Sequence, residues 1–258
     1  MLFGKELLWG ENQVADKMAD EMMNRRVLIT GGAGGVGTVV TKRWLEAGAS
    51  VLVVDHAEKN LARLKEALPD ILMPRLHTLE TDVTQEDGAN AMIAYAEHEW
   101  GQAADTLLHL VGGFTMGPID GDEAPEQWRK MMDLNLNAVF HCYRAMVKAR
   151  KPHGSGWIVG LGARAAVSPG ANLMAYAAAK AGLVALTQAL SAEVRDQGIH
   201  VNVLLASTID TPANREAMGE KKADTWVTPD DIADATFYLC SERANAIHGA
   251  TLEIYNRA

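Results

Sequence analysis

The sequence predicts an α/β fold, in which a doubly wound parallel sheet of about seven strands carries helices on both faces. Short runs of β-branched and aliphatic residues alternate with longer segments of helical periodicity along most of the chain. Parallel strands need such helical crossovers, because the chain must return to the same end of the sheet before the next strand starts. A length of 258 residues with 48% hydrophobic residues is enough to bury one large core.

Most of the predicted strands are short apolar runs, as is typical of parallel strands covered on both faces. They are Val27–Thr30, Val51–Asp55, Leu76–Glu80, Thr106–Val111, Trp157–Leu161, His200–Leu204 and Thr251–Ile254. The segments between them repeat apolar residues at helical spacing. These predicted helices are Gly35–Ala47, Ala57–Ala67, Gln85–Trp100, Pro125–Ala149, Leu173–Gln197 and Pro229–Cys240.

The chain contains no internal repeat and no Pro- or Gly-rich linker, so we expect one domain over residues 25–258. Residues 1–24 precede the first strand and are open to two interpretations, an amphipathic helix or a disordered N-terminal extension. We expect this extension and the loop from Pro212 to Thr228 to be the least ordered parts of the chain.

The composition argues against several classes of protein. The formal net charge of −9 would repel nucleic acid and anionic lipid, and no block of Lys and Arg interrupts it. Cys142 and Cys240 each lie in a predicted helix, so neither a disulfide framework nor a metal site is expected. No apolar run approaches the roughly 20 residues of a membrane span, and the charged N-terminal segment does not resemble a signal peptide. We therefore expect a cytoplasmic protein that acts on a small molecule.

A glycine-rich turn, Thr30-Gly31-Gly32-Ala33-Gly34-Gly35-Val36-Gly37, follows the first strand. Glycines allow the backbone to turn sharply and to approach a pyrophosphate without an intervening Cβ atom. The helix that follows would point its free N–H groups at the phosphates. Such turns also simply join strands to helices, but the strand–turn–helix context favours a nucleotide. The expected coenzyme contacts in this turn are Gly31, Gly34, Gly35, Val36 and Gly37.

Asp55 ends the second strand, where a carboxylate can accept hydrogen bonds from an adenosine ribose diol. Its charge would repel a 2′-phosphate, and the adjacent His56 is a poor substitute for an arginine, so NAD(H) is predicted over NADP(H). The alternative is that Asp55 only caps the next helix. After the third strand, Asp82 and Val83 are expected at the adenine edge, although Asp82 is equally suited to cap the helix that begins near Gln85.

Tyr176 and Lys180 lie four residues apart on a long Ala-rich helix, so the phenol and the ammonium share one face. A nearby ammonium favours the phenolate and is expected to lower the tyrosine pKa from about 10 toward working pH. Tyr176 would then exchange a proton with the substrate. Lys180 would tune this exchange and hold the nicotinamide ribose.

With these motifs in this order, the chain resembles a short-chain dehydrogenase/reductase from about Arg25 to its C-terminus. The matching residues are Thr30-Gly31…Gly35…Gly37, Asp55, Asp82-Val83, Asn135 in Asp133-Leu134-Asn135-Leu136, Tyr176…Lys180 and Ile209-Asp210-Thr211-Pro212. The resemblance implies a Rossmann-type sheet, with Asn135 in a water-linked proton relay to Lys180. It also implies coenzyme contacts from Ile209 and from Thr211, the latter near the nicotinamide carboxamide. Finally, it implies a homodimer or homotetramer packed through the predicted helices Pro125–Ala149 and Leu173–Gln197.

Three departures from the family pattern concern the substrate side. The usual Asn-Asn-Ala-Gly after the fourth strand is His109-Leu110-Val111-Gly112; His109 is expected to be satisfied by backbone groups, and Val111, Gly112 and Gly113 to contact the coenzyme. The usual Pro-Gly after the sixth strand is Ala206-Ser207. The substrate-orienting serine, thirteen residues before the tyrosine, is Ala163. Loss of its hydroxyl would cost an ordinary alcohol dehydrogenase about two to three powers of ten in rate.

One branch of the family, the members similar to quinonoid dihydropteridine reductase, lacks this serine naturally. Its Gly-Ala-Lys-Ala-Ala segment is similar to Gly162-Ala163-Arg164-Ala165-Ala166. The likeness extends to Thr208-Ile209-Asp210-Thr211-Pro212-Ala213-Asn214-Arg215, to Met218 and to Trp226-Val227-Thr228-Pro229. Resemblance to this branch implies hydride transfer from NADH to a conjugated imine or quinonoid ring, with Tyr176 as the proton donor. The residues expected to line the substrate pocket are Phe114, Ala163, Arg164 and Thr208.

Three functions therefore remain open from the sequence, and the reductase of a quinonoid or imine substrate leads. The second is a dehydrogenase of carbonyl compounds or secondary alcohols, in which Arg164, Thr208 or a bound water replaces the serine. The third is an NAD(H)-binding sensor or scaffold without turnover, against which the retention of Tyr176, Lys180 and Asn135 argues.

Overall fold

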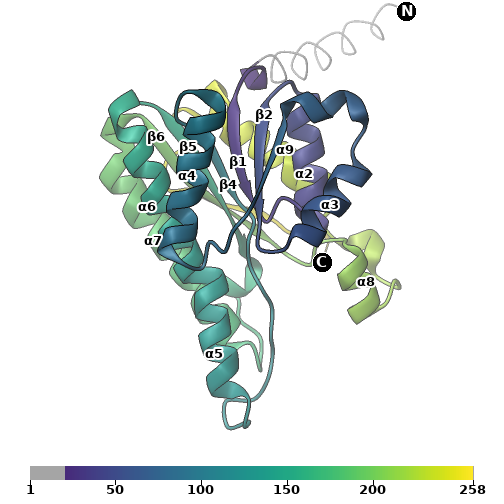
Figure 1. The fold of residues 1–258 in the computed structure, drawn as a ribbon. Helices are drawn as coiled ribbons and strands as arrows, with labels where there is room; N and C mark the ends of the chain where they lie inside the picture. Colours follow the sequence, from purple (N-terminus) through teal and green to yellow (C-terminus); the bar gives the residue numbers. More distant parts are fainter. Residues whose placement is uncertain (1–20, 258) are drawn as a thin grey trace, which may run out of the picture.

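Seven parallel strands form the centre of the molecule, and helices cover both of their faces (Figure 1). The computed structural model describes residues 21–257. The strand order is β3-β2-β1-β4-β5-β6-β7, and every pairing is parallel. The first strand, β1, therefore lies inside the sheet. β2 and β3 are added on one side of it, and β4 to β7 follow on the other side, so the order of the strands reverses between β1 and β4. Ligands of open α/β sheets bind at this reversal, beyond the carboxyl ends of the strands. The predicted fold class is confirmed.

The strands agree closely with the sequence prediction. They are β1 Arg26–Thr30, β2 Ser50–Asp55, β3 Leu76–Glu80, β4 Thr106–His109, β5 Gly156–Ala163, β6 Ile199–Ala206 and β7 Thr251–Ile254. β4 ends at His109 rather than at the predicted Val111, whose backbone instead lies against the turn at Gly31. β5 continues beyond Leu161, because its pairing with β6 extends to Ala163 opposite Ala206.

Within residues 21–257, three helices cover each face of the sheet. On one face lie α2 Gly35–Glu46, α3 Glu58–Ala67 and α9 Pro229–Leu239, and on the other α4 Glu86–Trp100, α6 Ala138–Arg150 and α7 Met174–Val194 (Figure 1). Successive side chains of a strand point to opposite faces. Accordingly, Val27 and Ile29 of β1 pack with the first set of helices, and Leu28 packs with the second.

Two segments differ from the predicted helices and loops. The predicted helix Pro125–Ala149 consists of α5 Ala124–Met132 and α6, joined by a π-helical turn over Asp133–Asn137. The predicted loop Pro212–Thr228 begins with the helix α8 Pro212–Met218, which the sequence prediction missed. Thr211 caps this helix by accepting a hydrogen bond from the Asn214 N–H (3.2 Å), and Pro212 occupies the first helical turn. Both α5 and α8 project beyond the carboxyl end of the sheet (Figure 1).

Short 3-10 helices complete the described chain. They are Asp70–Arg75, Lys151–His153, Arg164–Ala166, Arg195–Gln197, Ala223–Thr225 and Glu242–Ala244.

Packing begins before the first strand. Met22 is fully buried in the core that contains β1 and α2, and the Asn24 N–H donates to the Gly48 carbonyl (3.1 Å). Most of the predicted N-terminal extension, residues 1–20, lies outside the described residues. Within residues 21–257, no helix combines the length and the apolar character needed to cross a bilayer.

Candidate active site

The glycine turn after β1 leaves room for a ligand at the N-terminus of α2. Gly31 has a φ of +70°, a conformation that L side chains rarely adopt. A Cβ atom on Gly37 would lie 2.1 Å from the Gly31 carbonyl oxygen, so only glycine fits where the helix passes the turn. Gly34 offers no side chain to the first N–H groups of α2, and both Gly34 and Gly35 are exposed. This arrangement fits the pyrophosphate of a dinucleotide, because exposed helical N–H groups bind phosphate oxygens.

Asp55 binds the turn that leads into α3 through one carboxylate oxygen and keeps the other oxygen available. Its Oδ1 accepts hydrogen bonds from the Ala57 N–H (3.2 Å) and from Nδ2 of Asn60 (2.8 Å). The capping alternative is therefore wrong, because Ala57 is the N-cap of α3 and no side chain caps this helix. Among residues 21–257, no group donates a hydrogen bond to Oδ2, although Asp55 is only 7% exposed. The side chain of the neighbouring His56 is 76% exposed, with Nδ1 3.4 Å from Oδ1.

Asp82 and Val83 lie past the end of β3 but differ in their surroundings. The Asp82 carboxylate accepts hydrogen bonds from the N–H (2.9 Å) and hydroxyl (2.7 Å) of Thr84, and α4 begins later with Gln85 as its N-cap. The suggestion that Asp82 caps α4 is thus wrong, because its side chain stabilises its own turn. Val83 is only 4% exposed and packs in the core.

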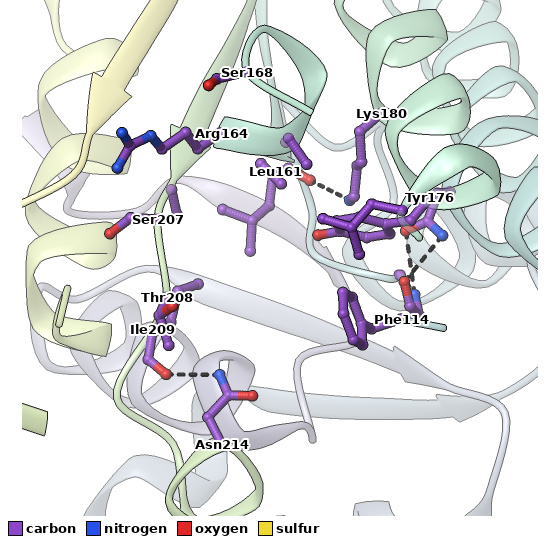
Figure 2. A pocket seen from close by; sticks show the side chains of 18 of the residues that line it. Phe114, Leu161, Arg164, Ser168, Tyr176, Lys180, Ser207, Thr208, Ile209 and Asn214 are labelled. Atoms are coloured by element: carbon purple, nitrogen blue, oxygen red, sulfur yellow. Dashed lines mark hydrogen bonds between the residues drawn. The ribbon is translucent and has the colours of Figure 1, made fainter. Parts of the chain in front are cut away.

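Tyr176 and Lys180 of α7 open onto a cleft beyond the carboxyl ends of β4, β5 and β6 (Figure 2). Nζ of Lys180 donates a hydrogen bond to the Leu161 carbonyl (2.8 Å) and lies 6.0 Å from the centroid of the Tyr176 ring. Burial lowers the pKa of Lys180 to about 8 and raises the pKa of Tyr176 to about 12. The expected lowering of the tyrosine pKa is wrong for this structure, because desolvation of the phenolate outweighs the ammonium at this distance. Tyr176 is consequently a neutral phenol at neutral pH.

The π-helical turn places Asn135 against the segment that follows β4. Its Oδ1 accepts from the Gly113 N–H (3.2 Å), and its Nδ2 donates to the carbonyl oxygens of Gly113 (3.1 Å) and Met131 (3.2 Å). A Cβ atom on Gly112 would lie 2.8 Å from Oδ1 of Asn135 and 3.3 Å from Nζ of Lys180. The glycine therefore lets both side chains approach one point of the backbone. The water-linked relay between them remains a prediction.

His109, at the end of β4, is a buried neutral imidazole. Its Nδ1 lies 2.9 Å from the hydroxyl of Thr30, so its partner is a side chain rather than the expected backbone group. Its ring meets that of Tyr143 edge to face at 6.3 Å. Burial, and to a lesser extent the charge of Lys180, lower the pKa of His109 to about 3. His109 therefore carries no charge at physiological pH.

The cleft has a volume of about 560 Å³, and all four predicted substrate residues line it (Figure 2). The ring of Phe114 meets that of Tyr176 edge to face at 5.1 Å and is itself 59% exposed. Ala163 is 9% exposed at the end of β5. The Arg164 guanidinium lies 5.3 Å from the Tyr255 ring and points away from Tyr176 (Figure 2). Thr208 borders the cleft from the wall opposite Tyr176 (Figure 2).

The segment after β6 connects this cleft to the glycine turn. A Cβ atom on Gly35 would lie 3.4 Å from the side chain of Thr211, so the two predicted coenzyme segments are in contact. Ile209 pairs with Val227 in an isolated parallel bridge, and its carbonyl accepts from Nδ2 of Asn214 (2.8 Å). Ile209 itself lines the cleft, as does Gly112, whereas Val111 lies over Gly31.

Sequence reasoning missed part of the cleft lining. The additional residues are Leu110, Leu161, Gly162, Ala165, Ser168, Leu173, Ala206, Ser207, Asn214 and Met218. Asn214 and Met218 belong to the strings that resemble the dihydropteridine reductase branch, which is the signal that could have identified them. Ser168 and Leu173 stand in the irregular connection between β5 and α7, where no periodicity indicates which side chains face inward. Within the described residues, no group of three or more His, Cys, Asp and Glu side chains is placed to hold a metal ion.

Comparison with known proteins identifies relatives along nearly the whole chain. Residues 25–222 match the sequence model of the family described as short chain dehydrogenase. The 3beta-hydroxysteroid dehydrogenase 2 of Eggerthella lenta is 30% identical over 250 residues, which cover 90% of this chain and 94% of the relative. The galactitol 2-dehydrogenase of Rhizobium johnstonii is 32% identical over 243 residues, covering 89% and 93%. Among solved structures, the 3-ketoacyl-(acyl-carrier-protein) reductase from Brucella melitensis complexed with NADH matches with a TM-score of 0.81 and 26% identity, covering 91% of this chain and 98% of that one.

Proposed function

Because the chain belongs to the short-chain dehydrogenase family, we propose that it is an NAD(H)-dependent oxidoreductase that interconverts a carbonyl compound and a secondary alcohol. One observation carries the proposal: Tyr176 and Lys180 open onto the same cleft as the segment that contacts the glycine turn. The family relatives named above include dehydrogenases of a hydroxysteroid and of galactitol. These names favour the carbonyl or alcohol interpretation over the quinonoid interpretation that led from the sequence alone.

The coenzyme would be held by residues from both halves of the sheet. Gly31, Gly34, Gly35, Val36 and Gly37 would hold the pyrophosphate, and Asp55 would accept hydrogen bonds from the adenosine ribose. The remaining proposed contacts are His56, Asp82, Val83, Val111, Gly112, Gly113, Tyr176, Lys180, Ile209 and Thr211. The available Oδ2 of Asp55 supports NAD(H) over NADP(H), since a 2′-phosphate would meet its negative charge. A bound nicotinamide coenzyme would supply or accept the hydride.

The protein's own residues would carry out the proton transfer. In the direction of reduction, the neutral phenol of Tyr176 would donate its proton to the substrate oxygen, while the carbonyl carbon receives the hydride. Lys180 would remain charged below its pKa of about 8 and would stabilise the phenolate left behind. Asn135, through its hydrogen bonds to Gly113, would keep the segment after β4 against this site. The high pKa of Tyr176 supports proton donation, because the phenol is fully protonated at pH 7.

A second candidate substrate, a conjugated imine or quinonoid ring of the dihydropteridine kind, is favoured by Ala163. This residue presents a methyl group to the cleft where a substrate-gripping hydroxyl would be expected. Phe114 stands edge-on to Tyr176 and offers an apolar wall to a flat ring. A single proton donor would suffice for such a substrate.

The experiment that tests the proposal is steady-state oxidation of NADH with four substrates. The panel comprises a 3-ketosteroid, a ketohexose, acetophenone and a quinonoid dihydropterin, each also measured with NADPH. We expect turnover of at least one of the three ketones and a preference for NADH. Turnover of the dihydropterin alone would support the second candidate, and activity with none of the four would contradict both.

The Ala163→Ser variant separates the two candidates further. Restoring the hydroxyl should raise kcat/KM for ketones if a carbonyl oxygen is bound near residue 163. It should leave dihydropterin reduction unchanged, because that reaction needs no second hydroxyl.

We also propose that residues 25–258 form one domain and that the protein assembles as a homodimer or homotetramer. Trp128 of α5 and Phe140 of α6 are 43% and 50% exposed, which supports an interface along these helices together with α7. Two buried free cysteines in the described chain are consistent with the proposed cytoplasmic localisation. Analytical ultracentrifugation would give the oligomeric state.

A further inference from the structure

The cleft contains several polar groups that could take the role of the missing serine, and most of them are already engaged. Nζ of Lys180 donates to the Leu161 carbonyl (2.8 Å), and the Asn135 amide is bonded to Gly113. Nδ2 of Asn214 donates to the Ile209 carbonyl (2.8 Å). The hydroxyl of Ser207 donates to the Tyr255 carbonyl (2.8 Å). A substrate oxygen would have to displace an internal hydrogen bond to use Ser207 or Asn135. Lys180 and Asn214 each keep a further N–H, but neither carries a hydroxyl, the group that the missing serine supplies.

Two hydroxyls of the lining remain besides that of Tyr176, and they differ in accessibility. Ser168 lies on the exposed connection after β5, where water competes for its hydroxyl. Thr208 is half-buried, and within residues 21–257 its hydroxyl makes no hydrogen bond. A donor shielded from water contributes more to binding and to transition-state stabilisation than an exposed one.

The backbone places Thr208 just beyond β6, the strand that pairs with the end of β5. β5 and β6 pair to their last residues, Ala163 opposite Ala206, so Thr208 follows two residues beyond the partner of Ala163. The Thr208 carbonyl accepts from the Val227 N–H (3.0 Å), and the next residue, Ile209, bridges Val227. Figure 2 shows Thr208 across the cleft from Tyr176 and Phe114. A donor held by such contacts needs little reorganisation when charge develops on the substrate.

We propose that Thr208 is a catalytic residue, whose hydroxyl donates a hydrogen bond to the substrate oxygen in place of the serine replaced by Ala163. This inference rests on the proposed carbonyl or alcohol chemistry. The substrate oxygen lies between two hydroxyls supplied by opposite walls of the cleft. Thr208 donates a hydrogen bond to the substrate oxygen and keeps its proton, whereas Tyr176 transfers its proton to that oxygen.

Four variants test this role. Thr208→Val removes the hydroxyl and keeps the shape, Thr208→Ser keeps the hydroxyl, Ala163→Ser restores the family residue, and the fourth combines Ala163→Ser with Thr208→Val. With the best ketone of the panel, we expect Thr208→Val to lower kcat/KM by about a hundredfold, the effect of losing one such donor. We expect Thr208→Ser to stay within about threefold of wild type, and the double variant to recover at least about tenfold of the loss.

A binding measurement without turnover gives an independent readout. In the Tyr176→Phe background with NADH bound, the dissociation constant of acetophenone is measured by quenching of NADH fluorescence. Addition of Thr208→Val should raise this constant about fivefold to tenfold, as loss of one net hydrogen bond does, whereas addition of Thr208→Ser should not. The dissociation constant of NADH itself should be the same in all variants.

The outcomes separate the two proposals. If wild type reduces a ketone and Thr208→Val does so equally well, the role of Thr208 is refuted while the proposed function stands. An equal loss in Thr208→Val and Thr208→Ser would show that packing by the threonine methyl matters, which also refutes the hydroxyl role. If wild type reduces no ketone, the proposed function fails, and the role of Thr208 fails with it.

Discussion

In the proposed function, the two halves of the sheet recognise ligands by different means. In the half built from β1, β2 and β3, the turn at Gly31–Gly37 and the carboxylate of Asp55 lie close together in the sequence and directly after strands. In the half built from β4, β5 and β6, the cleft is assembled from residues between Leu110 and Met218, most of them on connecting segments. The proposed coenzyme half depends largely on the backbone shape of the glycine turn, together with the one carboxylate of Asp55, and the proposed substrate half depends on individual side chains.

This difference indicates which half tolerates change. A Cβ atom on Gly37 would collide with the backbone of the turn, whereas the substrate half departs from the family pattern at His109, at Ala163 and at Ala206-Ser207 while the same sheet forms. Backbone-mediated binding is fixed by sterics, and side-chain-mediated binding is free to diverge. Five substitutions test this contrast, in order of decreasing effect.

The largest effect is expected in the substrate half, at Tyr176. The change Tyr176→Phe removes the proposed proton donor and should lower kcat for the best ketone by at least about a hundredfold. Steady-state NADH oxidation at saturating NADH measures this loss, so that a weaker contact of residue 176 with the coenzyme does not contribute to it. A variant that retains half of the wild-type kcat would remove Tyr176 from the proposed chemistry.

The change Gly37→Ala tests the backbone half. Because the added Cβ would meet the Gly31 carbonyl oxygen at 2.1 Å, the turn must shift. We expect a loss of about 1–3 kcal/mol in the free energy of unfolding and at least about a tenfold rise in the dissociation constant of NADH, because the helical N–H groups move with the turn. Urea denaturation and calorimetry measure the two quantities.

The matched control for Gly37 is Gly170→Ala, whose Cβ would have no neighbour closer than 3.5 Å. The free energy of unfolding and the dissociation constant of NADH should both equal those of the wild type in this control. Similar losses in the two variants would contradict the steric argument.

The change Asp55→Asn removes the charge but keeps an oxygen that can accept from Ala57 and Asn60. We therefore expect the ratio of kcat/KM for NADH to that for NADPH to fall by about tenfold, equivalent to about 1.4 kcal/mol, with little change in Tm. Asp82→Asn provides the comparison, since Asp82 bonds within its own turn. If the ratio of kcat/KM for NADH to that for NADPH were unchanged in Asp55→Asn, the proposed role of Asp55 in the preference for NAD(H) would be contradicted.

The change Lys180→Met tests the cost of the buried ammonium. The pKa of Lys180 is lowered from 10.5 to about 8 by burial. At pH 7 the amine is charged in both the folded and the unfolded states, so its burial penalty is fully present. As pH rises from about 8 to 10.5 the folded state binds fewer protons than the unfolded state, so wild-type stability increases relative to the variant.

We therefore expect Lys180→Met to be more stable than wild type by about 1–3 kcal/mol at pH 7. The Leu161 carbonyl loses its donor in the variant, which limits the gain. Urea denaturation at pH 7 and at pH 10 should show the difference shrinking. A variant less stable than wild type at pH 7 would indicate that the hydrogen bond to Leu161 outweighs the desolvation of the ammonium.

The smallest effect is expected at His109, the departure buried most deeply. The change His109→Asn introduces the family residue and removes an imidazole whose pKa is about 3. Because that imidazole is uncharged above pH 5, the pH profile of kcat/KM between about 5 and 8 should be unaltered, and kcat/KM should stay within about threefold. A shift in the acidic limb of the pH profile of kcat/KM would mean that His109 titrates between about pH 5 and 8.

The same contrast explains what the sequence could predict. The sheet, the glycine turn and Asp55 depend on local patterns, since apolar runs, glycines and a strand-end carboxylate are each visible within a few residues. The π-helical turn at Asn135 was not predictable, because the spacing of apolar residues does not distinguish one widened turn from the α-helix around it. The pKa of Tyr176 was misjudged, because residue spacing on α7 shows that Lys180 is near but does not show how much water either side chain loses.

The cleft could be predicted only in part for the same reason. Phe114, Ala163, Arg164 and Thr208 follow strands or match family motifs, and all of them line it. Ser168 belongs to an irregular connection whose inward face depends on contacts between distant segments.

The bridge between Ile209 and Val227 has a consequence for how such a protein changes specificity. This pairing holds the two ends of the segment 209–227, which contains α8, next to each other. The segment therefore forms a closed loop, and it contributes Asn214 and Met218 to the cleft. Because Thr211 contacts Gly35, we expect the residues beyond Thr211, and not Thr211 itself, to accept insertions, deletions or exchanges while the sheet and the glycine turn keep their geometry. The closed loop is therefore a module that protein engineers could transplant between relatives to alter the choice of substrate.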